Sequence, residues 1–446
     1  AILAQGLSSL RRGPGATCTG ACLRAPAPMS RRGQISIDKI VALRSSSLPL
    51  YVLIRQDGTV TASDEVSEDG NDFLTTNMHG DEISFRSICG DYLSAEGGLQ
   101  VSTRRHCSAD ERFLVEKVGT QYAFRARRGG YLSVTGRAPW VTLADTPGET
   151  ELFQLFSLMM AGVNVGKQLE TLERTGSIFI DGLLDQQAVS SLRGEAAHET
   201  WQGPEQLGHE TRCGGLAGRS PGFAELAAHP VVMQLAKRLL SPALRLSDVE
   251  SCCADADYVR KELEATTWHV VHPYSSAEFP GIVDPRASFT AVWFLDVLDQ
   301  GNSTWAWVKA PLTDGACLPK LPNLSSREEV EAVVTAATPL TAPAGSAWLY
   351  VGPVWVSNNM GAASFWKDYD AQTRYKHLSG QKEQTFRALT DAQRGAPRRE
   401  ELCPMVVQAT YVREYVVPRS AARLAPEALS GLDDPERRSL QKLCDF

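Results

Sequence analysis

The sequence has no long hydrophobic run, no excess of positive charge and no dense set of cysteines. Its longest uncharged apolar stretch, 152–166, is shorter than the roughly 20 residues of a membrane-spanning helix, so we expect no transmembrane segment. The net charge of −7 argues against a nucleic-acid-binding protein. Ten cysteines match neither a disulfide-dense domain nor a zinc motif. The adjacent Cys252 and Cys253 are expected to be ordinary buried thiols, with a redox centre as the alternative.

Acidic residues are also absent from the first 37 positions, which contain five arginines. An arginine-rich segment without acids is typical of an organellar transit peptide, and a disordered basic tail is the alternative. We therefore expect residues 1–34 to be a basic arm and the protein to be organellar. A thylakoid-associated location in the plastid is favoured over the mitochondrion. Because Ala1 is not an initiator methionine, we expect the chain to be processed or truncated.

At 446 residues the chain is longer than a usual single core, so two or three domains are expected. Between positions 40 and 158 a pattern recurs three times: an alternating strand pattern, then a tyrosine, then a phenylalanine 40 residues after the previous one. The openings are 41–45, 83–87 and 122–126, the tyrosines are Tyr51, Tyr92 and Tyr131, and the closing residues are Phe73, Phe113 and Phe153. Units this short must share one core, in which we place these aromatic residues.

The repeated phenylalanine-arginine-serine and tyrosine-leucine-serine motifs resemble the fascin-like, actin-crosslinking family. The resemblance implies a β-trefoil over residues 35–158. Fascin-like units bind actin, sugars or other proteins, so a trefoil-led actin- or glycan-binding protein is one alternative function. The basic loops 104–106 and 125–128 are expected to be solvated, with an anion or partner site as the alternative.

The second half contains the strand patterns 268–274, 289–296 and 344–359. A helix precedes them at 186–197, for which Asp185 is the expected N-cap. These motifs and their order resemble the phytanoyl-CoA dioxygenase-like family. The resemblance implies a double-stranded β-helix, a jelly roll with flanking helices, over residues 163–420. An insertion at about 361–404 and a C-terminal helical tail at 421–446 complete the expected domains.

Members of this family hold Fe(II) with a His-x-Asp strand and a late histidine, and they bind 2-oxoglutarate beside the metal. The matching positions here are His269, Val271 and Val356. Valine has no donor atom, so we interpret these as vestigial metal-site positions and His269 as a pocket histidine. The bulky Trp305, Trp348 and Trp355 are the expected fillers of that pocket.

The family's 2-oxoglutarate anchor, an arginine or lysine at the start of the last strand, is replaced by Cys403 and Pro404. Arg398, Arg399 and Arg413 remain as other candidates for it. We therefore expect no catalytic residue, no metal and no cofactor. The alternative is an Fe(II)/2-oxoglutarate-dependent dioxygenase with atypical ligands.

The insertion carries an aromatic group, Phe365, Trp366, Tyr369 and Tyr375. Aromatic residues with nearby Arg and Lys are favoured at interface anchors, so this group is a possible partner surface. The alternative is a cap on the barrel's own open end. Together these features predict a mainly β protein in which a dioxygenase fold serves as a non-catalytic scaffold. Its partners would be the protein subunits of a larger complex, at the periphery of a membrane, with no nucleic acid.

Overall fold

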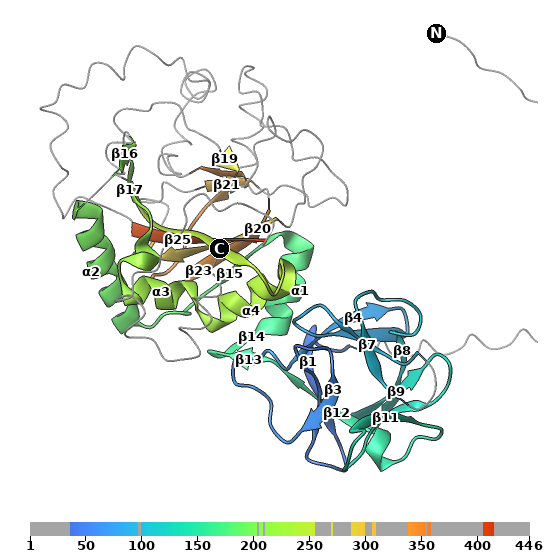
Figure 1. Ribbon diagram of the computed structural model, residues 1–446. Coiled ribbons are helices and arrows are strands. Elements are labelled where there is room, and N and C mark those ends of the chain that lie inside the picture. The colour runs from blue at the N-terminus through green and yellow to red at the C-terminus, as the bar shows by residue number, and fades with distance from the viewer. Residues whose placement is uncertain are drawn as a thin grey trace, which may run out of the picture. The chain divides into compact units, whose positions relative to one another are not determined.

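The computed structural model of the protein describes residues 36–96, 100–202, 205–207, 210–254, 269–270, 287–298, 306–308, 338–352, 355–357 and 405–413 (Figure 1). In these ranges the chain is mostly β-sheet with a few helices, as the sequence predicts. The predicted arm (1–34), insertion (361–404) and C-terminal helix (421–446) lie outside the described residues. None of the helices in the described ranges is long and apolar enough to cross a membrane.

The described residues from 36 to 158, here called the repeat region, form twelve short strands. They are β1 (Ile40–Ser45), β2 (Tyr51–Ile54), β3 (Val60–Ser63), β4 (Leu74–His79), β5 (Glu82–Arg86), β6 (Tyr92–Ser94), β7 (Ser102–Arg104), β8 (Phe113–Val118), β9 (Gln121–Ala126), β10 (Tyr131–Val134), β11 (Val141–Ala144) and β12 (Phe153–Ser157), with a 3-10 turn, η1, at Glu149–Glu151. The three predicted openings coincide with β1, β5 and β9, and the three tyrosines begin β2, β6 and β10.

Six of these strands close into a ring by antiparallel pairing. β1 pairs with β4, β4 with β5, β5 with β8, β8 with β9, β9 with β12, and β12 with β1. The remaining strands form the hairpins β2–β3, β6–β7 and β10–β11, which join the ring at β1, β5 and β9. The threefold repeat in the sequence therefore becomes three four-stranded units that share one core.

Four phenylalanines form the centre of this core. Phe85, Phe113, Phe124 and Phe153 are fully buried. The ring centroids of Phe85 and Phe124 lie 4.9 Å apart in an edge-to-face arrangement, and those of Phe124 and Phe153 lie 5.7 Å apart. Such pairs contribute about 0.5–1.5 kcal/mol beyond the burial of their area. The predicted core position is thus confirmed for Phe113 and Phe153.

The same prediction is wrong for Phe73 and for two of the tyrosines. Phe73 is half-buried and packs against the apolar cluster that contains Leu158 and the helices that follow. Tyr51 and Tyr92 are half-buried, whereas Tyr131 is buried. A tyrosine places its hydroxyl near water while its ring packs, so a repeated tyrosine does not have to be a core residue.

The described residues from 159 to 413, here called the two-sheet region, contain four α-helices and thirteen short strands. The helices are α1 (Val165–Thr175), α2 (Gln186–Gln202), α3 (Pro221–Ala227) and α4 (Pro230–Leu239), with a 3-10 turn, η2, at Leu216–Gly218. The strands are β13 (Met159–Met160), β14 (Val163–Asn164), β15 (Ser177–Ile180), β16 (Glu205–Leu207), β17 (Glu210–Cys213), β18 (Arg245–Ala254), β19 (His269–Val270), β20 (Ser288–Phe294), β21 (Ala306–Val308), β22 (Thr338–Pro339), β23 (Ala347–Val351), β24 (Trp355–Ser357) and β25 (Met405–Val412).

Local sequence accounts for the helix ends. Asp185 Oδ1 accepts a hydrogen bond of 2.8 Å from Ala188 N, which confirms the predicted N-cap of α2, although the helix continues past the expected end at 197 to Gln202. Helix α1 ends at Gly176, whose φ of 77° is the left-handed conformation that glycine adopts without strain.

Two antiparallel sheets form from these strands. The larger has the order β15-β23-β20-β25-β18-β17-β16, and the smaller has the order β19-β24-β21-β22. One buried face of the larger sheet shares an apolar cluster with residues of α1, α3 and α4. Residues on the other face form a separate apolar cluster, and this face carries the candidate site.

Candidate functional site

Successive residues of β20, β23 and β25 alternate between the two faces of the larger sheet, as they must in an extended strand. The helix-side cluster takes Phe289, Ala291, Trp293, Ala347, Leu349, Val351, Val407, Ala409 and Tyr411. The opposite cluster takes Cys252, Val292, Phe294, Trp348, Tyr350 and Val406, together with Leu298, Leu340 and Ala342. We call the face that carries this second set the inner face.

Aromatic rings cover the β15–β23–β20 end of the inner face. Phe179 stacks on Phe294 and on Trp348, with ring centroids 6.1 and 6.0 Å away, and Trp348 lies 4.5 Å from Tyr350. Trp348 is fully buried there, and its predicted role as a pocket filler stays a prediction. Trp305 lies outside the described residues, and of Trp355 only the backbone is described.

A tight turn sets the start of β23. Gly345 has a φ of 83°, and a Cβ added to it would lie 2.5 Å from the carbonyl oxygen of Leu184. Gly345 N donates to Phe294 O at 2.8 Å, and Leu184 N donates to Gly345 O at 3.0 Å. Only glycine fits this approach of two backbones, which explains the glycine of the Ala344-Gly345-Ser346 motif.

Neutral polar side chains lie on three neighbouring strands of the larger sheet. The strand register places Thr290 between Thr410 on β25 and Tyr350 on β23. Thr290 Oγ1 is buried with no hydrogen-bond partner among the described residues, and Gln408 Nε2 donates to Thr410 Oγ1 at 3.4 Å. These side chains offer hydrogen-bond donors and acceptors but no fixed positive charge.

The smaller sheet brings two of the three predicted metal positions together. In the pairing of β19 with β24, His269 is the direct partner of Val356, and Trp307 of β21 pairs with Val356 from the other side. The assignment of these positions to a metal site stays a prediction. Val271 follows β19 and lies outside the described residues.

These positions do not fit an Fe(II) site of the facial-triad type. Such a site needs two imidazoles and a carboxylate on one side of the metal. Here His269 is the strand partner of a valine, and the position that the resemblance gives to the carboxylate is a second valine in the sequence. In the described ranges, no group of three His, Cys, Asp or Glu side chains lies close enough to hold a metal ion.

At the start of β25, where the resemblance implies an arginine or lysine, the backbone amide binds a carboxylate. Met405 N donates to Asp296 Oδ2 at 2.9 Å, and the other oxygen of Asp296 lies 2.7 Å from Arg193 Nε on α2. The carboxylate of Asp296 is thus paired with an arginine and with a backbone amide. Arg398 and Arg399 lie outside the described residues, and Arg413 stands at the opposite end of the strand. Sequence analysis missed the Arg193–Asp296 pair because the two residues are far apart in the chain.

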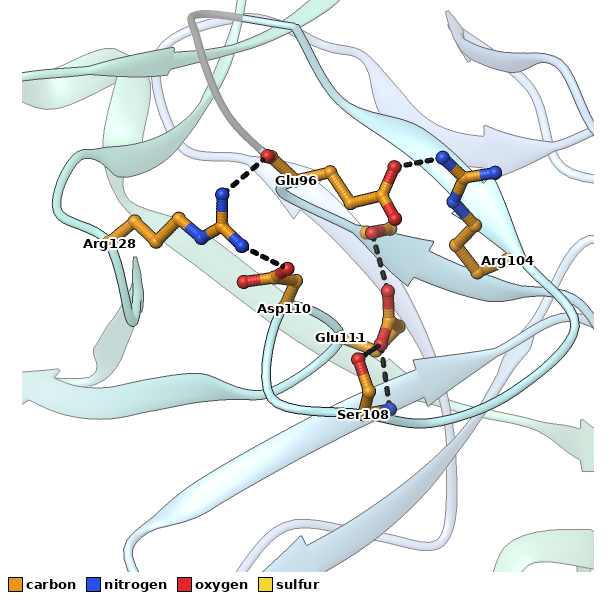
Figure 2. A network of polar contacts seen from close by, with 7 residues as sticks. Glu96, Arg104, Ser108, Asp110, Glu111 and Arg128 are labelled. Carbon is orange, nitrogen blue, oxygen red and sulfur yellow. Dashed lines mark hydrogen bonds and ion pairs between the residues drawn. The ribbon is translucent and has the colours of Figure 1, made fainter.

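The predicted basic loops of the repeat region are paired with acidic residues (Figure 2). Arg104 forms an ion pair with Glu96, and Arg128 donates to Asp110 Oδ2 at 2.9 Å and to the carbonyl oxygen of Glu96 at 3.0 Å. Arg105 lies 2.9 Å from Asp91. Acids therefore neutralise Arg104, Arg105 and Arg128, whereas Arg125 lies over the ring of Tyr131.

Glu111 anchors the centre of this network (Figure 2). It accepts hydrogen bonds from Ser94 Oγ at 2.6 Å, Ser108 N at 2.7 Å and Ser108 Oγ at 2.5 Å. Burial raises the pKa of the Glu111 carboxyl, and the hydrogen bonds from Ser108 and Ser94 outweigh it, so the pKa lies below its ordinary value. The satisfied carboxylate holds the loop in place, which is a structural role.

Cys252 and Cys253 are both buried in β18, in agreement with the expectation of ordinary thiols. Adjacent residues of a strand point to opposite faces, and Cys252 belongs to the inner-face cluster. This geometry separates the two sulfurs.

Comparisons with known proteins give two kinds of similarity. The Fascin domain family matches residues 49–155, and no curated protein matches the sequence. Among solved structures, the chain is similar to the non-heme alpha ketoglutarate dependent epimerase SnoN from nogalamycin biosynthesis, with 17% identity, a TM-score of 0.35 and coverage of 56% of this chain and 82% of that one. It is also similar to HygX from Streptomyces hygroscopicus with nickel and 2-oxoglutarate bound, with 13% identity, a TM-score of 0.37 and coverage of 56% and 88%.

Proposed function

We propose that the protein is a non-catalytic scaffold in which a β-trefoil is joined to a dioxygenase-like jelly roll. The closed six-stranded ring with three hairpins and the Fascin domain match support a fascin-like trefoil over residues 35–158. The two sheets and their apolar faces support a double-stranded β-helix of the phytanoyl-CoA dioxygenase-like type over residues 163–420.

One observation carries the non-catalytic part of the proposal. His269 faces Val356 across β19 and β24, so the position of the late histidine is occupied by a side chain that cannot bind a metal. The buried Trp348 on the inner face adds to it, since an apolar ring offers no partner to a charged co-substrate. Loss of one ligand alone disables a site that needs its full set.

The proposed role is that of an accessory subunit in an organellar complex, whose protein partners bind at surfaces such as the aromatic group of the insertion. This part rests on the composition of residues 1–34 and 361–404 alone. The plastid is favoured over the mitochondrion. Purification of the tagged full-length chain from its source should yield stoichiometric protein partners. Recovery of the chain only as a monomer would contradict this part.

A second candidate is an Fe(II)/2-oxoglutarate-dependent dioxygenase with atypical ligands. It is favoured by the presence of His269 on a strand of the smaller sheet, where it could act as one ligand if others came from residues outside the described ranges. SnoN is alpha ketoglutarate dependent and HygX binds 2-oxoglutarate, but TM-scores of 0.35 and 0.37 with the chain carry no argument for this candidate.

Anaerobic titration of the purified chain with Fe(II) and with 2-oxoglutarate distinguishes these candidates. The scaffold proposal predicts no saturable binding of either. Binding that disappears in His269→Ala would establish the dioxygenase candidate instead. The restored variant Val271→Asp with Val356→His can be compared with Val270→Asp with Val356→His, which places the carboxylate on the opposite face of the strand. Metal binding by the first variant alone would confirm the alignment.

A further inference from the structure

The threefold repeat contains an arginine–tyrosine pair that is broken in one unit. Three cross-strand pairs share this pattern: Arg44 with Tyr51, Arg86 with Tyr92 and Arg125 with Tyr131. In the first and third units the guanidinium lies over the tyrosine ring, 5.7 and 5.9 Å from its centroid. In the second unit Arg86 Nη2 instead donates to the carbonyl oxygen of Arg238 at 3.2 Å.

Arg238 lies in the last turn of α4, in the two-sheet region. The last four carbonyls of a helix have no partner within the helix, and a cation at this end is favourable. Arg86 supplies both the donor and the charge. The repeated arginine has therefore been diverted from its own tyrosine to the end of a helix in the other region.

The side chain of Arg238 makes the reciprocal contact and is buried, with 6% of its surface exposed. Its Nη1 donates to Thr75 Oγ1 at 2.7 Å, and its Nη2 donates to the carbonyl oxygens of Gly70 and Phe73 at 3.1 and 2.9 Å. All three acceptors belong to the repeat region. None of the described contacts of Arg238 is with a carboxylate, so the charge is held by neutral oxygens alone.

Gln234, one helical turn earlier, completes the contact. Its Oε1 accepts from Arg238 Nε at 3.1 Å, while its Nε2 donates to Asp69 O at 2.7 Å and to Asn71 Oδ1 at 2.9 Å. The spacing of four residues places both side chains on one face of α4. Both ends of the amide are used, so the turn 69–75 is held at several points along its backbone.

Apolar packing at the same place explains why Phe73 leaves the threefold core. Phe73 packs against the apolar cluster that joins Leu158 and Met160 to α1 and α4. A Cβ on Gly70 would lie 2.9 Å from atoms of both Leu158 and Met160, so the turn is closely covered.

A buried guanidinium without a carboxylate is costly to desolvate, so stabilisation is a poor explanation for Arg238. Burial lowers its pKa to about 9, with a smaller effect of Arg86 in the same direction, which leaves the group protonated at neutral pH. The planar fork with several donors instead suits the fixing of an orientation against fixed carbonyls.

We propose that Arg238 and Gln234 form a clamp that binds the turn 69–75 and makes the repeat region and the two-sheet region one cooperative unit. The clamp binds the turn that closes the first unit and also involves Arg86 of the second unit, and it leaves the arginine–tyrosine pairs of the first and third units intact. It is independent of whether the two-sheet region is catalytic.

The test uses Arg238→Met, which keeps the apolar stem and removes the charge and the hydrogen bonds. Calorimetry of the full chain should show one cooperative unfolding transition before the change and two after it. Hydrogen exchange of the amides in 69–75 should accelerate at least tenfold. A single transition with unchanged exchange in Arg238→Met would overturn the proposal, as would two transitions in the unchanged protein.

Three matched variants separate the clamp from a general effect of losing an arginine. Arg86→Met removes one donor to the clamp, whereas Arg44→Met and Arg125→Met remove the equivalent residues of the other units. Only Arg86→Met should accelerate exchange in 69–75, by several-fold. Equal acceleration in all three would overturn the proposal. This series decides the question even if Arg238→Met fails to fold.

Discussion

The repeat region and the two-sheet region differ in how their sequences encode a core. In the repeat region an equivalent core position recurs in each of the three units. Phe85, Phe113, Phe124 and Phe153 are therefore recognisable from their spacing along the chain. In the two-sheet region each core position occurs once. Only the alternation of side chains between the two faces of β20, β23 and β25 indicates it. The comparison teaches that a repeat marks the shared strand starts and core positions such as Phe113 and Phe153, although Phe73, Tyr51 and Tyr92 are only half-buried. A single motif reveals a strand and leaves its chemistry to be tested.

The largest expected effect concerns the closing phenylalanines. Phe153→Ala should destabilise the protein by about 3–5 kcal/mol, because a fully buried aromatic side chain is lost from the ring. Phe73→Ala, at the equivalent position, should cost less than half as much, because Phe73 is half-buried outside that core. Denaturant unfolding measures both free energies. Equal losses would mean that the threefold symmetry of the core is intact after all.

The turn before β23 gives the next effect. Gly345→Ala should cost at least about 2 kcal/mol, from the positive φ and from the approach of the new methyl group to Leu184 O. Gly194→Ala on α2 is the control, because a Cβ there meets nothing within 4 Å and alanine favours a helix by up to about 1 kcal/mol. The midpoints of thermal and chemical unfolding should fall for Gly345→Ala and rise for Gly194→Ala. A neutral Gly345→Ala would show that the turn is wrongly placed.

A smaller effect is expected from pH. Burial lowers the pKa of His229 to about 4, against a weaker opposing hydrogen bond with the backbone of Leu183. The unfolded chain binds a proton near pH 6.5, so the folded state loses stability as the pH falls from 6.5 to about 4, and the contribution is fully present above 6.5. Allowing for partial exposure, the unchanged protein should lose on the order of 1–2 kcal/mol more than His229→Gln between pH 7 and 4.5.

His79 in the repeat region is the control for this measurement. Its pKa is also lowered, by burial first and then by Arg112, but it is less buried. His79→Gln should therefore reduce the loss of unfolding free energy between pH 7 and 4.5 by less than His229→Gln does. The opposite order would contradict the assignment of His229 as the more strongly buried histidine.

Much of the fold was predictable from the sequence, and the reasons are local. The 40-residue period places the strand starts at Tyr92 and Tyr131, and the capping rule places the start of α2 at Asp185.

What the sequence did not predict depends on contacts between distant residues. An arginine in an amphipathic helix is ordinarily expected to face solvent, so Arg238 gave no sign that it is buried against the turn 69–75. The departure of Phe73 from the core follows from the same contact. The basic loops were interpreted without the acids that neutralise them, although Glu96 and Asp110 lie in the same unit of the repeat.

Turnover tests most directly the proposal that the two-sheet region holds no catalytic iron. The purified full-length chain would be assayed for bound iron and for succinate release from 2-oxoglutarate, with Fe(II), ascorbate and oxygen supplied. The account predicts substoichiometric iron and no succinate above the level without protein. Stoichiometric iron with succinate release that His269→Ala abolishes would contradict it.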